Sequence, residues 1–272
     1  MTKEWPRSLV LVGAGKMGGA MAAGWLEGGL AASSLTILEP NPSDEIVRLA
    51  ASRGVALNPD DPPPPDVLAL AVKPQSLDAV APRAAPLAGE RTLVLSILAG
   101  KTIANLKARL PNAKAVVRAM PNTPAAIGRG VTAGYATPEA AADQRRWAET
   151  LLGAVGAFHW LDDEAALDAV TAISGGGPAY VFALTEALAA AAERLGLPAE
   201  LAMSLARGAV EGAGELMWRE PGTPPSVLRR NVTSPGGTTA AALAVLQGED
   251  GLDALMARAA AAARARAAEM AG

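Results

Sequence analysis

A glycine-rich turn near the start of the chain has the residue pattern that binds the pyrophosphate of a dinucleotide. Gly13–Gly18 reads G-A-G-K-M-G, follows the aliphatic run Ser8–Val12 and precedes a helical stretch. Glycines in this context allow a tight turn and the close approach of a phosphate. The start of the following helix adds free N–H groups and positive potential. The pattern predicts a dinucleotide site; the alternative is a glycine turn that binds no ligand.

An acidic residue at the end of the second predicted strand bears on the choice of dinucleotide. Glu39 lies about 20 residues past Gly18, where a carboxylate accepts hydrogen bonds from the adenosine ribose and repels a 2′-phosphate. Glu39 therefore favours NADH. The loop that follows contains Asn41 and Ser43, which could contact a phosphate. The residues alone leave NADH and NADPH both open.

Two further motifs close predicted strands. Ala71–Pro74 ends the third strand and Arg118–Pro124 ends the fifth. In open α/β sheets, ligands bind at the carboxyl ends of the strands. Lys73 could therefore face a phosphate or ribose, or it could be a surface lysine before a helix. Asn122 offers both a donor and an acceptor, and we expect it to line the space for nicotinamide and substrate.

The second half of the chain carries two glycine motifs of its own. Ser174–Pro178 separates two helical stretches, and its glycines would let a backbone or ligand approach closely; the alternative is a plain helix break. Thr233–Thr239 precedes an alanine-rich helix. Hydroxyls and glycines at a helix start form an anion site that suits a carboxylate. A simpler interpretation of the same residues is an N-cap made by Ser234 or Thr238.

The residue types that are missing narrow the chemistry. The 272-residue chain has no cysteine, which excludes disulfides, cysteine-ligated metals and thiol nucleophiles. His159 is the single histidine, so no site can use two histidine ligands, and we expect it to be structural or on the surface. No metal site is expected. A net charge of -3 argues against nucleic-acid binding.

The absence of lysine from the second half bears on the reaction. No lysine follows Lys114. Oxidation of an alcohol by a dinucleotide enzyme usually needs a lysine or histidine to take the hydroxyl proton. A protonated imine is already electrophilic, and a hydroxyl with its waters can deliver the proton. The composition therefore favours reduction of a C=N bond over hydroxyacid oxidation.

The elements that must position these residues change character along the chain. Strands are expected at 8–12, 34–38, 67–72, 92–97, 115–118, 130–135 and 158–161. Helices are expected from the glycine turn to 27 and at 46–53, 76–81, 103–109, 140–152, 180–195, 198–218, 238–246 and 250–270, with a loop at 220–226. The alternation in the first half predicts a parallel sheet with helices on both faces.

The fold class expected is α/β, with an N-terminal Rossmann-type dinucleotide-binding domain, 1–161, followed by an all-α dimerisation and substrate-binding domain, 162–272. The stretch Tyr180–Ala192 is apolar nearly all round and must be covered on every side. We expect a second subunit to cover it. No targeting or membrane-spanning segment is visible, which predicts a cytoplasmic protein.

At this point the sequence resembles the pyrroline-5-carboxylate reductase family. The matching stretches are VGAGKMG, LAVKPQ at Leu70–Gln75, RAMPNTP, AISGGGPAYVF at Ala172–Phe182 and NVTSPGGTTAAAL at Asn231–Leu243. They follow the family order across nearly the whole chain. The resemblance implies the final step of proline biosynthesis, in which hydride passes to C5 of 1-pyrroline-5-carboxylate and gives L-proline.

The resemblance also implies roles for individual residues. Thr239 matches the catalytic threonine near the imine nitrogen, and Ser234 with the N–H groups of Gly237 and Thr238 would hold the substrate carboxylate. NADPH is the cofactor implied, with NADH an alternative because of Glu39. Together with the glycine motif, the expected cofactor-binding residues are Val12, Gly13, Ala14, Gly15, Lys16, Met17, Gly18, Glu39, Asn58, Ala71, Val72, Lys73, Pro74, Ala99 and Asn231.

The chain departs from the family pattern at a few positions. Gly176 stands where serine is usual, Leu98 replaces an alanine and narrows the expected pocket near Ala99, and Arg230 replaces a common acid.

The family implies a homodimer with interlocked helical domains, often assembled into a decamer, whose monomers are inactive. Two alternatives stay open: an imine or hydroxyacid reductase for another small carboxylate, and a dinucleotide-binding redox sensor that catalyses nothing.

Overall fold

The computed structural model describes residues 4–271, which form two compact units. Unit 1 contains residues 4–176 together with 263–271, and unit 2 contains residues 177–262. The boundary expected from the sequence pattern, between 161 and 162, falls just after the last strand, while unit 1 continues through a further helical segment. That boundary stays a prediction about function, and the two units are described separately.

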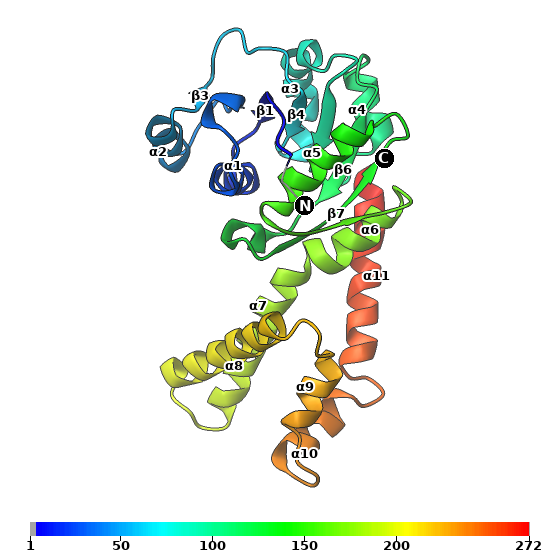
Figure 1. Ribbon diagram of the computed structural model, residues 1–272. Coiled ribbons are helices and arrows are strands. Elements are labelled where there is room, and N and C mark those ends of the chain that lie inside the picture. Colours follow the sequence, from blue (N-terminus) through cyan, green and yellow to red (C-terminus); the bar gives the residue numbers. More distant parts are fainter. Residues whose placement is uncertain (1–3, 272) are drawn as a thin grey trace. The chain divides into compact units, whose positions relative to one another are not determined.

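Unit 1 is built on an eight-stranded sheet of order β3-β2-β1-β4-β5-β6-β7-β8 (Figure 1). The strands are β1 (Leu9–Val12), β2 (Leu35–Leu38), β3 (Ala56–Leu57), β4 (Val67–Leu70), β5 (Leu93–Ser96), β6 (Val116–Met120), β7 (Gly130–Ala136) and β8 (Gly156–Trp160). All the expected strands are confirmed, with ends within about two residues. The two-residue strand β3 was not expected, because so short a segment has no readable alternation.

The expectation of a wholly parallel sheet is wrong at one place. β6 and β7 pair antiparallel, whereas β7 and β8 are parallel again. The connection from β6 to β7 contains only the short 3-10 helix η4 (Thr123–Ile127). A parallel pairing needs a crossover of roughly a dozen residues or more, so this short connection reverses the strand.

The helices of unit 1 cover both faces of the sheet, as expected. They are α1 (Lys16–Gly28), α2 (Asp44–Arg53), α3 (Leu77–Ala84), α4 (Ile103–Arg109), α5 (Ala142–Gly153) and α6 (Ala166–Val170), with the short 3-10 turns η1 (Ala32–Ser34), η2 (Pro74–Ser76) and η3 (Ala85–Leu87). Leu9 and Leu11 of β1 pack with buried side chains of α1, α2 and α5. Val10 and Val12 pack with those of α3 and α4. Alternate side chains of one strand thus pack into the hydrophobic core on each face of the sheet.

The glycine run after α6 does not break the helix. Thr171–Gly175 forms a π-helical turn, η5, and Gly176 keeps right-handed helical angles, with φ -81°. The alternative of a plain helix break is therefore wrong. A Cβ on Gly175 would lie 2.8 Å from Cε of Met120, so glycine allows the turn to pack against the end of β6. The atoms nearest to that Cβ belong to the side chains of Met120 and Thr171, so the close approach of a backbone or a ligand stays a prediction.

Unit 2 consists of helices. These are α7 (Gly177–Arg194), α8 (Ala199–Arg219), α9 (Pro225–Asn231), α10 (Thr238–Leu246) and the first part of α11 (Leu252–Ala271). The helix α9 was not expected, because the proline-rich stretch before it indicated a loop. α7 and α8 pack against each other. No helix of residues 4–271 is long and apolar enough to span a membrane.

Candidate active site

The three glycines of the N-terminal turn serve three different purposes. Gly13 has φ +92°, and a Cβ there would lie 2.7 Å from the backbone N of Val72. A Cβ on Gly18 would lie 2.2 Å from the carbonyl oxygen of Gly13, so this glycine lets α1 pack closely on the turn. A Cβ on Gly15 would meet nothing within 4 Å. Open space at the second glycine is what the approach of a pyrophosphate requires.

The helix that starts at this turn leaves its N–H groups available. Gly15 is the N-cap of α1 and makes no side-chain cap, and the first turn of the helix has no acidic residue. Backbone hydrogen bonds from Gly13 to Leu38 and from Ala71 to Val12, both under 3 Å, fix the turn against the ends of β2 and β4. A rigid, uncapped helix start with open space in front of it fits the phosphates of a dinucleotide.

Glu39 and Asn58 lie together at the end of β2. Oε2 of Glu39 accepts a hydrogen bond from the N–H of Ala14 at 2.9 Å, and Oε1 accepts one from Asn41 at 3.0 Å. Asn58 exchanges two hydrogen bonds of 2.8 Å with the backbone of Glu39. The structure therefore brings the expected cofactor residues Ala14, Glu39 and Asn58 into one hydrogen-bonded group.

The expected residues after β4 and β5 lie at the carboxyl ends of those strands. Ala71 and Val72 are half-buried, Val72 beside Gly13, and Lys73 is exposed. Pro74 starts η2, and Ala99 is half-buried after β5. Leu98 is 2% exposed and belongs to the core on the α3 and α4 face.

Asn122 is held by the fold. It is 8% exposed, and its Oδ1 accepts a hydrogen bond from the N–H of Val131 at 2.9 Å. Ser174 donates its hydroxyl to the carbonyl of Val131 at 3.3 Å. The motifs around Asn122 and Ser174, distant in sequence, therefore meet in unit 1, and the backbone of Val131 uses one of the two acceptor positions of Oδ1 of Asn122.

A buried ion cluster that sequence reasoning missed holds the same region. The guanidinium of Arg118, whose side chain is 6% exposed, lies 3.1 Å from Glu164 and 3.9 Å from Asp168. Oε1 of Glu164 also accepts from the N–H of Ile103, the first residue of α4. The cluster ties β6 to α4 and α6. An arginine inside an otherwise apolar strand was the available signal.

In unit 2, the serine–glycine–threonine segment forms an uncapped helix start. The N-cap of α10 is Gly237, with no side-chain cap, so the simpler interpretation of Ser234 or Thr238 as the cap is wrong. Ser234, Thr238 and Thr239 are exposed. The first-turn N–H groups of a helix have no intrahelical acceptor, which leaves those of Thr238 and Thr239 available.

One expected donor in this segment is already engaged. The N–H of Gly237 donates to the carbonyl of Ser234 at 3.0 Å, and Gly236 has φ +68°, which turns the chain into the helix. A carboxylate would therefore meet the N–H of Thr238 and the hydroxyl of Ser234 more readily than the N–H of Gly237. Asn231 is exposed at the end of α9.

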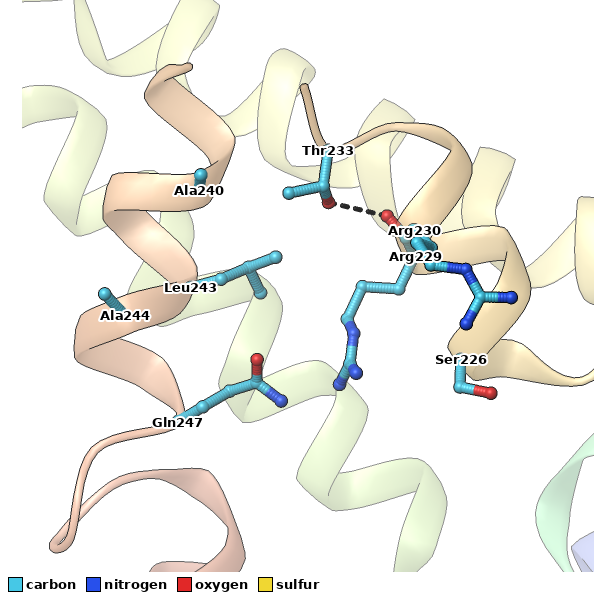
Figure 2. A pocket seen from close by; sticks show the side chains of 8 residues that line it. All are labelled: Ser226, Arg229, Arg230, Thr233, Ala240, Leu243, Ala244 and Gln247. Carbon is cyan, nitrogen blue, oxygen red and sulfur yellow. Dashed lines mark hydrogen bonds between the residues drawn. The ribbon is translucent and has the colours of Figure 1, made fainter. Parts of the chain in front are cut away.

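A cavity of about 460 Å³ that the sequence did not reveal lies between α9 and α10 (Figure 2). Its lining consists of Ser226, Arg229, Arg230, Thr233, Ala240, Leu243, Ala244 and Gln247. Thr233 donates its hydroxyl to the carbonyl of Arg229 at 2.6 Å. One lining residue is Arg230, which departs from the family pattern. Ser234 and Thr239 are not among the lining residues.

Two expectations about other groups can be compared with the structure. His159 is exposed on β8, as expected for a surface residue. Within residues 4–271, no cluster of three or more histidine or acidic side chains could hold a metal ion. Unit 1 thus contains the expected dinucleotide residues except Asn231, and unit 2 contains Asn231 and the expected substrate residues.

Comparisons with known proteins agree with this arrangement. The family model described as pyrroline-5-carboxylate reductase dimerisation matches residues 164–270, and the one described as NADP oxidoreductase coenzyme F420-dependent matches residues 8–100. The chain is 39% identical over 266 residues to a pyrroline-5-carboxylate reductase of Pseudomonas aeruginosa, covering 97% of this chain and 96% of that one.

Solved structures show the same similarity. A pyrroline-5-carboxylate reductase from Coxiella burnetii has a TM-score of 0.87 and 33% identity, with 98% of this chain and 99% of the other covered. A pyrroline carboxylate reductase of Plasmodium falciparum with NADP bound has a TM-score of 0.80 and 26% identity, with 97% and 98% covered.

Proposed function

The chain belongs to the pyrroline-5-carboxylate reductase family, and we propose that it reduces the C=N bond of 1-pyrroline-5-carboxylate to give L-proline. It is an oxidoreductase of proline biosynthesis, and a nicotinamide dinucleotide supplies the hydride. The observation that carries the proposal is the pair of uncapped helix starts. One follows the open space at Gly15, and the other carries Ser234, Thr238 and Thr239.

The dinucleotide belongs to unit 1 in this proposal. The N–H groups at the start of α1 hold the pyrophosphate, and Gly15 leaves room for it. The remaining expected contacts lie at the ends of β2, β3, β4 and β5, apart from Asn231 in unit 2. The proposed functional division is a cofactor domain at 1–161 and a dimerisation domain at 162–272, which the separate family matches at 8–100 and 164–270 support.

In this proposal the substrate carboxylate binds at the start of α10. The hydroxyl of Ser234 and the N–H of Thr238 donate to it, and the positive end of the helix favours its charge. The N–H of Gly237 joins them when its turn to Ser234 opens. Thr239, in the first turn of the same helix, donates its hydroxyl toward the imine nitrogen and passes on a proton that water replaces, which completes the reduction.

A Thr239→Ala variant tests this role. We expect kcat to fall by about 10–1000-fold, because a transition-state hydrogen bond of roughly 1.4–4 kcal/mol is lost. The dissociation constant of the dinucleotide, measured without substrate, should stay unchanged. Thr239→Ser keeps a hydroxyl and is the matched control. A kcat that the alanine leaves unchanged would remove Thr239 from the mechanism, and wild-type protein that binds dinucleotide without turnover would favour the redox sensor.

Assembly is part of the proposed site. Exposed apolar side chains on α7 and α8 include Phe182 at 65% and Trp218 at 57%. The exposure of these side chains supports a homodimer with interlocked helices, in which a second copy buries them and the monomers are inactive. A decamer of five such dimers is the larger assembly expected, and sedimentation velocity distinguishes the two. The cytoplasmic location stays a prediction that cell fractionation tests.

A further inference from the structure

The carboxylate of Glu39 is fixed at the rim of the glycine turn by hydrogen bonds to both oxygens. Oε2 accepts from the N–H of Ala14, inside the turn, at 2.9 Å. Oε1 accepts from the N–H of Asn41 at 3.0 Å. Moving this carboxylate away from a ligand would therefore break two hydrogen bonds to a charged acceptor, which are stronger than neutral ones.

The backbone of Glu39 is fixed from the other side by Asn58. Oδ1 of Asn58 accepts from the N–H of Glu39 and Nδ2 donates to its carbonyl, both at 2.8 Å. Asn58 has φ 51°, in the left-handed region, where asparagine is among the few tolerated side chains. This strained residue keeps the end of β2 in one position, so Glu39 is preorganised.

The fixed carboxylate suits a ribose diol and opposes a phosphate. An ionised carboxylate accepts about four hydrogen bonds, and protein groups provide one to each oxygen of Glu39. The carboxylate of Glu39 can therefore accept two more hydrogen bonds, one from each ribose hydroxyl. A 2′-phosphate ester carries a charge of about -2, has no proton to donate at neutral pH, and would be repelled.

The loop beside Glu39, residues 40–43, contains no lysine or arginine that would neutralise a phosphate. Ser43 uses its hydroxyl to cap α2, accepting from the N–H of Ile46 at 3.4 Å, and that helix begins with Asp44 and Glu45. One cation lies near the loop after Asn58: Nη2 of Arg83 donates to the carbonyl of Pro59 at 3.1 Å.

We propose that Glu39 makes this chain a selector of NADH over NADPH, through the adenosine ribose. The inference rests on the proposed function, because it concerns the cofactor of that reaction, and it opposes the NADPH that the family resemblance implies. Glu39 is the specificity-determining residue, and Asn58 positions it.

Direct binding of NAD⁺ and NADP⁺, measured by calorimetry without substrate, tests the proposal. The wild-type protein should bind NAD⁺ at least about 10-fold more tightly, a difference of about 1.4 kcal/mol. Glu39→Gln keeps an acceptor for Ala14 but removes the charge, and should reduce this ratio by about 10-fold. Glu27→Gln, which removes an exposed carboxylate at the far end of α1, is the matched control and should leave the ratio unchanged.

Three results would overturn the proposal. One is equal or tighter binding of NADP⁺ by the wild-type protein, which is informative whether or not the variants fold. Another is an unchanged ratio in folded Glu39→Gln. The third is an Arg83→Ala variant that loses affinity for NADP⁺ alone, since Arg83 would then hold a 2′-phosphate. Failure of the proposed function would differ: neither nucleotide would be oxidised with 1-pyrroline-5-carboxylate, while the binding ratio would stand.

Discussion

The two units of the chain differ in which apolar side chains they bury. In unit 1, large residues such as Trp25, Leu11 and Leu68 are fully buried on the two faces of the sheet. In unit 2, the buried hydrophobic residues within 177–262 are alanines, Ala189, Ala202 and Ala206. Large side chains on its helices stay exposed. Unit 1 therefore carries its own core, whereas unit 2, within a single chain, leaves large apolar side chains of its helices exposed.

The largest expected effect on stability lies in unit 1. Trp25 is 0% exposed, and its Nε1 donates to the carbonyl of Leu151 at 2.8 Å, which joins α1 to α5. Trp25→Ala should lower the free energy of unfolding by about 3–5 kcal/mol. The change in chemical denaturation should be independent of protein concentration, because the core is internal. Trp25→Phe, which loses the hydrogen bond and keeps most of the volume, should cost only about 1 kcal/mol.

A smaller effect, of a different kind, is expected in unit 2. Phe182→Glu places a charge on an exposed apolar face of α7 and should raise the dimer dissociation constant by at least about 100-fold, or 2.7 kcal/mol. Sedimentation at several concentrations measures this. Val47→Glu replaces a residue of α2 that is 44% exposed in unit 1 and is the control. Equal dissociation constants for the two variants would contradict the comparison.

The smallest expected effect is a loss of dinucleotide binding in unit 1 without a loss of stability. A Cβ at Gly15 or at Gly153 meets nothing within 4 Å. Alanine at either position should therefore change the free energy of unfolding by less than about 1 kcal/mol. Only Gly15→Ala should weaken dinucleotide binding, by about 10-fold, because its methyl group occupies the space left for the pyrophosphate. Calorimetry that finds the two variants equal would remove the turn from the site.

The sequence predicted unit 1 well where a physical constraint is local. Aliphatic runs predicted the buried strands, and Gly13, Gly15 and Gly18 predicted a turn whose geometry the structure confirms. It failed where the constraint is tertiary. The reversal of β7 depends on the length of a connection, and the packing of the π-helical turn beside Met120 joins segments distant in sequence.

In the candidate site, too, the sequence predicted local features and missed those that depend on tertiary contacts. The position of Glu39 alone predicts that it meets a ribose, but the hydrogen bonds with Ala14 and Asn58 that fix it join segments distant in sequence. The engagement of Asn122 by the backbone of Val131 was likewise unreadable. The cap expected of Ser234 or Thr238 was wrong because Gly237 takes that position. Residue types predicted the chemistry, while packing decided which atoms remain available.

The most direct test of the central claim follows a labelled hydride from the dinucleotide to the product. Nicotinamide dinucleotide deuterated at C4 is incubated with 1-pyrroline-5-carboxylate and the wild-type protein, and proline is analysed by mass spectrometry and NMR. The account predicts deuterium at C5 of L-proline, formed far more slowly by Thr239→Ala. Protein that binds the dinucleotide but never places deuterium in proline would contradict it.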